Sequence, residues 1–250
     1  SSAGVKALEA ANYEVITVKV AQEQLISYIN ENDIKALLVR SATTARKDLV
    51  DACPGLKLIG RGGVGMDNID VAYAREKGVH VINTPAASSA SVAELVFAHL
   101  YGGVRFLYDS NRNMPLEGEA NFGSLKKAYA KGIELRGKTL GIIGFGRIGQ
   151  EVAKIGLGVG MKVIAADPYS EGAKVPVSFF NGESIDVEIN TQSMDSVLES
   201  ADFISLHVPA QKEYVIDAKA LNKMKKGAGL VNAARGGVVD EVALVKALDD

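Results

Sequence analysis

The segment from residue 139 to residue 167 limits the fold more than any other part of the chain. An apolar run, Thr139–Ile143, leads directly into Gly144–Gly149, where the glycines are spaced Gly-x-Gly-x-x-Gly. Helix-like residues follow, and a second apolar run, Lys162–Ala166, ends at Asp167. A strand, a glycine turn, a helix, a second strand and an acid, in this order, predict the βαβ unit of a dinucleotide site.

Each glycine of the turn has a physical role in this interpretation. Gly144 permits the tight turn out of the strand, Gly146 lets a pyrophosphate approach the backbone, and Gly149 lets the helix pack closely on the sheet. Arg147 and Ile148 open the helix, whose free N–H groups and positive dipole end favour phosphates. The alternative is that the glycines only form a tight turn.

The acid distinguishes between the two nicotinamide dinucleotides. Asp167 lies 18 residues after Gly149, close to the spacing of about 20 that is typical of such sites. Its carboxylate can accept hydrogen bonds from ribose hydroxyls and repels a 2′-phosphate, and Pro168 and Tyr169 add no compensating positive charge. The sequence therefore predicts NAD rather than NADP.

The rest of the chain alternates strand-like and helix-like segments, which predicts doubly wound α/β architecture with parallel sheets covered on both faces. The expected strands are Tyr13–Val20, Ala36–Arg40, Leu56–Gly60, Val79–Asn83, Thr139–Ile143, Lys162–Ala166, Asp202–Val208 and Gly229–Asn232. The expected helices include Gln22–Asn32, Ala45–Ala52, Ile69–Lys77, Glu151–Leu157 and Ala218–Lys223.

Two domains are expected, residues 1–84 and residues 85–250, with a junction near Thr84–Pro85. A long helical segment, Ser88–Leu107, opens the second domain. The polar segment Asn111–Ala130 that follows is expected to be loop-like. It is either an arm that packs on a partner subunit or a solvent-exposed connector.

Composition excludes several classes of protein. The net charge of −2 gives no overall attraction to nucleic acid or to an anionic membrane. No apolar run approaches the roughly 20 residues that cross a bilayer, and the first residues do not form a secretory signal. The single Cys53 can make no internal disulfide, and no His, Cys or carboxylate spacing is typical of a metal site. A cytoplasmic protein without metal, nucleic-acid or membrane partners is expected.

A second cluster of candidate residues follows the strand that ends at Asn232. Arg235 lies in the turn beyond it, at the edge where open α/β sheets bind ligands. Its guanidinium is a rigid fork of donors suited to a carboxylate, and the alternative is a surface salt bridge. Asp240 is expected to cap the next helix, with Glu241 in its first turn.

A third cluster follows the strand Leu56–Gly60. Glycines at positions 62, 63 and 65 can expose consecutive N–H groups, which would form an anion-binding nest. Arg61 beside them and Arg40 at the tip of an earlier strand add positive charge, and Asn68 is the expected cap of the next helix. The alternative is that these glycines only make a turn.

The three histidines have different expected roles. His207 ends a strand on the cofactor side, so it could be a general acid–base, although the favoured interpretation is that it lines the cofactor pocket. His80 lies in a strand and His99 in a helix, and both are expected to be core or surface fillers.

Taken in order, the motifs resemble one family, the D-isomer-specific 2-hydroxyacid dehydrogenases. The resemblance rests on Val39–Thr43, Gly60–Asp70, Val81–Pro85, Ser91–Glu94, Gly144–Gly149 with Asp167–Pro168, His207–Pro209 and Asn232–Gly237. The Arg-Ser-Ala-Thr and Gly-Arg-Gly-Gly-Val-Gly forms most resemble the members that oxidise 3-phosphoglycerate to 3-phosphohydroxypyruvate in serine biosynthesis.

The resemblance implies a flavodoxin-like substrate domain and a Rossmann domain that binds NAD and forms a homodimer. It implies that Arg235 is catalytic and holds the carboxylate or carbonyl of a D-2-hydroxy acid during hydride transfer. The implied substrate contacts are Arg40, Arg61, Gly63, Val64 and Gly65. The candidate cofactor contacts are Gly144, Gly146, Arg147, Ile148, Gly149, Asp167, His207, Pro209, Ala233 and Arg235.

The chain departs from the family in one respect. The family's catalytic Glu and His lie beyond the arginine motif, and the chain ends at Asp250 before either of them. Residues 3–12 and Val242–Asp250 look helical, so a first strand and a C-terminal portion are expected to be absent. The alternative to an enzyme is a non-catalytic NAD-binding module that dimerises, as in corepressor-like relatives.

Overall fold

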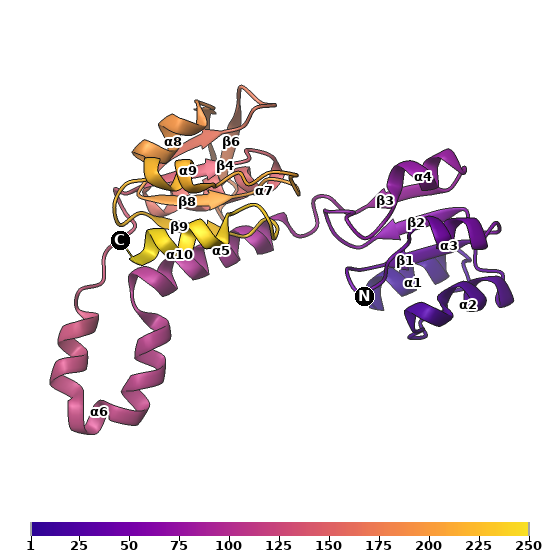
Figure 1. Ribbon diagram of the computed structural model, residues 1–250, viewed down its shortest axis with the longest axis horizontal. Coiled ribbons are helices and arrows are strands. Elements are labelled where there is room, and N and C mark those ends of the chain that lie inside the picture. The colour runs from indigo at the N-terminus through magenta and orange to yellow at the C-terminus, as the bar shows by residue number, and fades with distance from the viewer. Residues whose placement is uncertain (1, 250) are drawn as a thin grey trace. The chain divides into compact units, whose positions relative to one another are not determined.

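The computed structural model describes residues 2–249, and the chain divides between Thr84 and Pro85 into two compact units (Figure 1). The first unit contains a three-stranded parallel sheet, and the second contains a four-stranded parallel sheet and a separate two-stranded one. The α/β class and the parallel sheets that the sequence predicts are thus confirmed.

The strands of the first unit lie in chain order across its sheet, β1-β2-β3. They are β1 (Ala36–Val39), β2 (Leu58–Arg61) and β3 (His80–Asn83), and the helices are α1 (Ser2–Ala10), the 3₁₀ turn η1 (Gln22–Gln24), α2 (Leu25–Glu31), α3 (Lys47–Ala52) and α4 (Val71–Glu76). One face of the sheet, with Ile59 and Val81, packs on α2, α3 and α4. Because the strands are parallel, their carboxyl ends share one edge, where Val39, Arg61 and Asn83 lie side by side in register.

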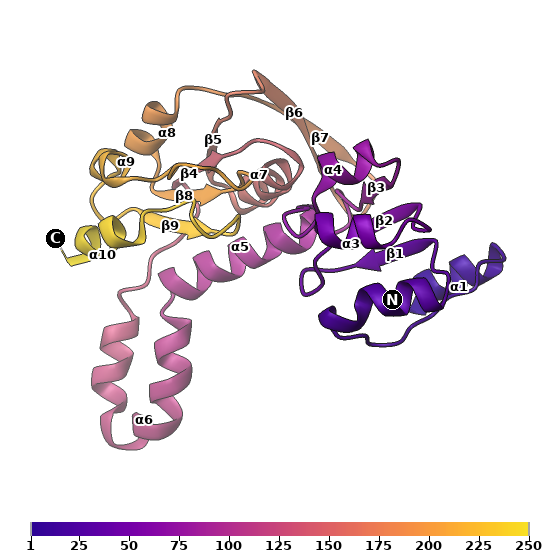
Figure 2. The same ribbon diagram turned by 45° about the vertical axis from the view of Figure 1, so that its right-hand side comes forward.

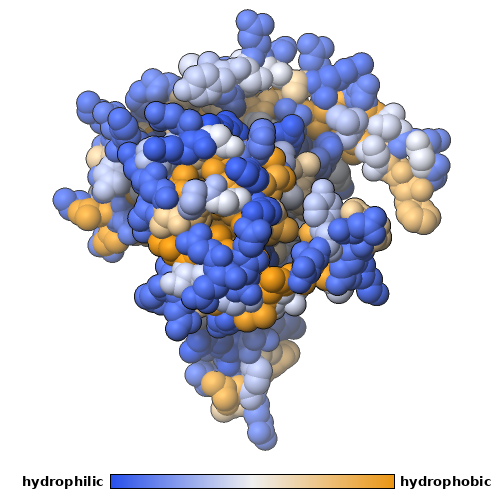
Figure 3. Space-filling model, turned by 90° about the vertical axis from the view of Figure 1, so that its right-hand side faces the viewer, coloured by the Kyte–Doolittle hydropathy of each residue, from blue (hydrophilic) through white to orange (hydrophobic). Residues whose placement is uncertain are grey.

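The expected strand Tyr13–Val20 is wrong. These residues form no strand, and Tyr13, Ile16 and Val18 are exposed. Alternating β-branched residues suit a strand, but a strand also needs a neighbour to satisfy its N–H and C=O groups. Apolar side chains of the first sheet are exposed too, namely Leu38 on β1 and Ile82 on β3. On the face of the molecule shown in Figure 3, apolar side chains also interrupt a mostly hydrophilic surface.

The main sheet of the second unit reverses its winding direction at β4, with the strand order β5-β4-β8-β9. Its strands are β4 (Thr139–Ile143), β5 (Lys162–Ala166), β8 (Phe203–Leu206) and β9 (Gly229–Asn232), and the surrounding helices are α5 (Ser89–Val104), α7 (Arg147–Val159), α8 (Met194–Ser200), α9 (Ala218–Lys223) and α10 (Glu241–Asp249). Doubly wound sheets bind ligands at such a reversal, beyond the carboxyl ends of the strands.

Helices cover both faces of this sheet, as its apolar strands require. Leu140 and Ile142 face α5 and α7, whereas Ile204 and Leu206 face α8 and α9. The packing is close at Gly141, where an added Cβ would lie 2.7 Å from Val197 Cγ1. Each sheet face therefore has its own core, and the carboxyl edge is left for the loops.

Two strands that the sequence analysis did not anticipate form an antiparallel hairpin (Figure 2). They are β6 (Gly172–Ser178) and β7 (Ser184–Asn190). Val175 and Ile189 are buried in the same core as α7, while Phe179 and Phe180 at the tip are exposed. The hairpin is thus anchored at its base and free of packing at its tip.

The expectation that Asn111–Ala130 is loop-like is wrong. Residues 111–129 of the segment lie within α6 (Leu107–Tyr129), which consists of two helical arms joined by a kink at Asn121, and Ala130 is its C-cap residue. Figures 1 and 2 show both arms extending away from the sheet of the second unit, and none of the described α6 residues is buried. The polar composition of this segment is therefore that of a helix with no buried residue, not that of a loop.

Candidate functional site

The carboxyl edge of the four-stranded sheet brings together residues from four distant parts of the sequence. Ala166, Ile143, Leu206 and Asn232 end β5, β4, β8 and β9, and strand register places them in one row. The residues that follow them, and so line this edge, are Asp167, Gly144, His207 and Ala233. All four are among the sequence-predicted cofactor contacts.

The first and third glycines of the turn are required by packing. Gly144 has a φ of 93°, and an added Cβ would lie 2.7 Å from the main-chain carbon and oxygen of His207. At Gly149 an added Cβ would lie 2.3 Å from the Gly144 carbonyl oxygen. At Gly146, by contrast, no described atom lies within 4 Å of the Cβ position. The turn therefore presents open backbone at its middle glycine.

The N-terminus of α7 meets this open backbone. Gly146 is the N-cap residue and supplies no side-chain cap, so the first amide groups of α7, from Arg147 onward, lack a side-chain acceptor. Unsatisfied N–H groups and the positive end of the helix dipole suit a phosphate. The donor set thus fits a nucleotide diphosphate.

Asp167 is fixed by the same turn. Its Oδ2 accepts a hydrogen bond from the Phe145 amide at 2.7 Å, and its Oδ1 accepts one from the Tyr169 amide at 2.8 Å. Each carboxylate oxygen has a second lone pair, so the group can still accept bonds from hydroxyls. This geometry fits a ribose and disfavours a second anion beside the carboxylate.

His207 is held at the end of β8 in a neutral state. Its Nε2 lies 2.8 Å from the buried Ser205 Oγ, and its buried Nδ1 has no hydrogen-bond partner within residues 2–249. Burial lowers the pKa of His207 to about 4, which makes the ring a weak base at neutral pH. This favours the pocket-lining role over the acid–base role.

Arg235 lies in a turn that Asn232 braces. Asn232 Nδ2 donates to the Arg235 carbonyl at 2.9 Å, and its Oδ1 accepts from the Ala234 amide at 3.1 Å. One guanidinium nitrogen of Arg235 donates to the Ala234 carbonyl at 2.8 Å. The half-buried arginine is therefore attached to the same edge as the candidate cofactor residues.

The helix after this turn begins as expected. Asp240 Oδ1 accepts hydrogen bonds from the amides of Val242 and Ala243, at 3.1 and 3.0 Å, and Glu241 lies in the first turn of α10. The capping role predicted for Asp240 is confirmed.

The glycine-rich loop of the first unit forms the second candidate site. It follows β2 and begins with the Gly62 amide, which donates to the Val39 carbonyl at 2.9 Å. Within residues 2–249, the amides of Val64, Gly65 and Met66 have no hydrogen-bond partner. Three consecutive free N–H groups are suited to an anion.

The two arginines of this region are placed differently. Arg40 is exposed, and its Cγ would lie 3.8 Å from a Cβ added at Gly62. Arg61 is partly buried, and its guanidinium donates to the Gly65 carbonyl. Arg40 therefore offers its charge to solvent beside the loop, whereas Arg61 is engaged with the loop.

Asn68 is not a helix cap, which corrects that expectation. Its Nδ2 donates to the carbonyls of Arg40 and Thr43, at 2.9 and 2.5 Å, and α4 instead begins after Asp70. The side chain holds the Arg40–Thr43 segment beside the glycine-rich loop. The sequence around Asn68 could not reveal this role, because the two carbonyls that accept its hydrogen bonds lie 28 and 25 residues away.

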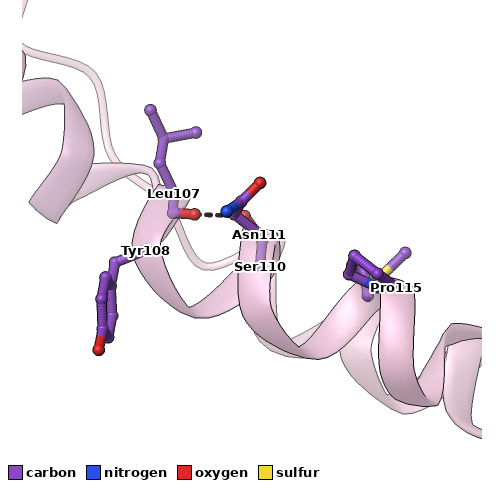
Figure 4. A pocket seen from close by; sticks show the side chains of 6 residues that line it. Leu107, Tyr108, Ser110, Asn111 and Pro115 are labelled. Carbon is purple, nitrogen blue, oxygen red and sulfur yellow. Dashed lines mark hydrogen bonds between the residues drawn. The ribbon is translucent and has the colours of Figure 1, made fainter.

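A separate open hollow of about 690 Å³ lies on α6 (Figure 4). Leu107, Tyr108, Ser110, Asn111, Met114 and Pro115 line it, and Ser110 Oγ donates to the Leu107 carbonyl at 3.2 Å. None of these lining residues belongs to the carboxyl edge, so the hollow is not part of the candidate cofactor site.

Among residues 2–249, no helix is both long and apolar enough to cross a bilayer. No group of three or more His, Cys, Asp or Glu side chains among them could hold a metal ion.

A glycine turn, an open helix N-terminus and a fixed acid at the reversal point of a doubly wound sheet define a dinucleotide-binding α/β protein. Residues 97–250 match the family described as D-isomer specific 2-hydroxyacid dehydrogenase, NAD binding domain. The chain belongs to this family and carries its NAD-binding domain.

Two relatives of the chain are named for different substrates, one with a phosphate group and one without. The chain is 42% identical over 92% of its length to a hydroxypyruvate reductase of Thermotoga maritima, covering 70% of that protein. It is 40% identical over 98% of its length to a D-3-phosphoglycerate dehydrogenase of Methanocaldococcus jannaschii, covering 44% of it. An NAD-dependent formate dehydrogenase from Staphylococcus aureus, solved with NAD, is 30% identical with a TM-score of 0.76, covering 99% of this chain and 71% of that one. The chain thus spans less than half the length of the phosphoglycerate dehydrogenase.

Proposed function

We propose that the protein is an NAD-dependent oxidoreductase that oxidises a D-2-hydroxy acid to the 2-keto acid, with 3-phosphoglycerate as its substrate in serine biosynthesis. The observation that carries the proposal is the shared sheet edge, where the fixed Asp167 and the braced Arg235 accompany the glycine turn. Family membership supports the reaction class.

The chain's own residues would divide the work of binding. Bound NAD supplies the hydride acceptor for C2 of the acid. The Gly144–Gly149 turn and the first amides of α7 hold the diphosphate, and Asp167 accepts bonds from the ribose hydroxyls. Arg235 holds the carboxylate or carbonyl of the acid, because a guanidinium can bond two oxygens in one plane.

The loop of the first unit would recognise the acid group. The free amides of Val64, Gly65 and Met66 can donate to a carboxylate. The substrate named in one relative, hydroxypyruvate, lacks the phosphate that 3-phosphoglycerate carries. The exposed Arg40 beside the loop supports the phosphorylated acid.

A steady-state assay tests the proposal. NADH absorbance is followed with 3-phosphoglycerate, D-glycerate and other 2-hydroxy acids. We expect the phosphorylated acid to give the highest kcat/KM, and Arg40→Ala to lower it about tenfold more than for D-glycerate, because one charge-assisted contact is lost. Higher kcat/KM for unphosphorylated acids would reject the substrate, and NAD binding without turnover would favour the non-catalytic module.

A cytoplasmic homodimer formed through the second unit completes the proposal. The extended arms of α6 support it, because Leu107, Tyr108, Leu116 and Phe122 are exposed on them. The buried thiol of Cys53, the only cysteine of the chain, supports a reducing compartment.

A further inference from the structure

Three consecutive carbonyls of the glycine-rich loop are each bonded to the edge of the first sheet. The Gly63 carbonyl accepts from the Thr84 amide at 3.2 Å, and the Val64 carbonyl accepts from Asn83 Nδ2 at 2.6 Å. The Gly65 carbonyl accepts from the Arg61 guanidinium. The loop backbone is thus tied down at every peptide unit between residues 63 and 66.

This pattern determines where the amides of the loop point. In a trans peptide unit the C=O and the following N–H are directed oppositely. When the carbonyls of residues 63, 64 and 65 turn toward the sheet edge, the amides of Val64, Gly65 and Met66 turn away from it. These are the three amides that have no partner within the described part of the chain.

Strand register explains how two side chains come to do this. Arg61 ends β2 and Asn83 ends β3, and the two are paired in register on neighbouring parallel strands. From these adjacent positions they reach adjacent carbonyls, those of Gly65 and Val64. Arg61 also lies against the loop, since a Cβ added at Gly63 would be 2.9 Å from its Nη1.

We propose that Asn83, together with Arg61, is a positioning residue that holds the three amides in the orientation that binds the acid group of the substrate. Asn83 acts through the Val64 carbonyl and has no contact with substrate in this assignment. The inference rests on the proposed function, because that function supplies the acid. It differs from a phosphate-binding role, since a neutral amide that shapes the loop affects all acids alike.

The test uses oxalate, a small dicarboxylate analogue of a 2-keto acid, as the probe in calorimetry on the NAD-bound protein. We expect Asn83→Ala to weaken oxalate binding about tenfold, as for the loss of one ordering hydrogen bond. Asn83→Asp should weaken it more, because a carboxylate cannot donate to the Val64 carbonyl and its negative charge also repels that carbonyl oxygen and the bound acid. The Kd for NAD should stay within about twofold of the wild type, and kcat/KM should fall by the same factor for 3-phosphoglycerate and D-glycerate.

A matched control separates positioning from a general loss of stability. Asn30 Nδ2 donates to the Ala52 carbonyl at 2.9 Å in the same unit, away from the glycine-rich loop. Asn30→Ala should therefore leave oxalate binding unchanged at a similar shift in Tm. Asn83→Gln, which keeps the donor, should recover part of the lost affinity.

The outcomes are distinguishable. Wild-type affinity for oxalate in Asn83→Ala, or a loss confined to phosphorylated acids, overturns this inference alone. A wild-type protein that turns over no 2-hydroxy acid but whose oxalate binding depends on Asn83 overturns the proposed function alone. A wild-type protein that binds no oxalate overturns both.

Discussion

At the scale of single residues, Asp167 has the clearest consequence for cofactor choice. Two amides hold its carboxylate in place, at 2.7 and 2.8 Å. Asp167→Ser removes the charge that repels a 2′-phosphate and weakens the contact with ribose. We expect NADH affinity to fall about tenfold and NADPH affinity to rise, as measured by fluorescence titration of the two reduced cofactors.

The control for this change is another aspartate of the second unit. Asp186 forms an exposed ion pair with Lys174 at 3.0 Å on the β6–β7 hairpin. Asp186→Ser should leave both affinities unchanged. An Asp167→Ser protein that keeps the wild-type preference would show that the acid does not select the cofactor.

His207 leads to a prediction about stability and pH. Its pKa is lowered to about 4 in the folded protein by burial, from an ordinary value of 6.5. Between these values the unfolded chain binds a proton that the native protein does not, so stability rises with pH across this window. The stabilisation is complete above pH 6.5 and is lost as the pH falls toward 4.

The matching variant is His207→Gln, which cannot titrate and keeps a polar group toward Ser205. Urea unfolding at a series of pH values should show the wild type losing roughly 3 kcal/mol more than the variant between pH 7 and pH 4. Parallel curves for the two proteins would mean that His207 is not buried in its neutral form.

Residues whose role follows from backbone geometry could be predicted from the sequence, and residues whose role follows from strand register could not. The Gly-x-Gly-x-x-Gly spacing identifies Gly144 and Gly149, because only a glycine fits the positive φ of the first and the close approach at the second. The sequence predicts no role for Asn83 and a wrong one, helix capping, for Asn68. Their amides bond to carbonyls 19 and 25 to 28 residues away, and those distances become short only in the folded sheet.

At the scale of elements, the packing of α8 on the sheet depends on one glycine. A Cβ added at Gly141 would lie 2.7 Å from Val197 Cγ1 and 2.8 Å from the Ala201 Cβ. Gly141→Ala should therefore destabilise the protein by about 1–3 kcal/mol, because α8 must move away from β4. Chemical denaturation measures the difference.

A glycine in α7 provides the opposite case. Gly158 is exposed, and no described atom lies within 4 Å of its Cβ position. Gly158→Ala should stabilise the protein by up to about 1 kcal/mol, since alanine favours a helix more than glycine does. A loss of stability in Gly158→Ala equal to that in Gly141→Ala would contradict the packing argument.

The two wrong predictions of secondary structure have the same explanation. A local sequence pattern does not specify which other segment a strand pairs with or a helix packs on. Tyr13–Val20 has a strand pattern without a paired strand, and α6 has a loop-like composition because none of its described residues is buried. The β6–β7 hairpin could have been found from Asn181–Gly182, since Asn-Gly between alternating apolar residues is a hairpin signal.

At the scale of the whole molecule, the two units carry different parts of the proposed chemistry. The second holds the glycine turn, Asp167 and Arg235, and the first holds the loop with free amides. Each feature depends on its own sheet edge. Sequence motifs located both edges, because a parallel sheet places every carboxyl end on one side.

The exposed apolar side chains of α6 lead to a prediction about assembly. Leu116 is 84% exposed and Phe122 is 54% exposed on its arms, which costs free energy in water unless a second copy covers them. Leu116→Glu with Phe122→Glu should shift the protein from dimer to monomer, as measured by sedimentation velocity over a range of concentrations. Phe180→Glu at the hairpin tip, a still more exposed apolar site outside α6, should leave the dimer intact. A monomeric wild type, or a dimer that survives both glutamates, would show that α6 is a connector and that its helical arms are stable without a partner.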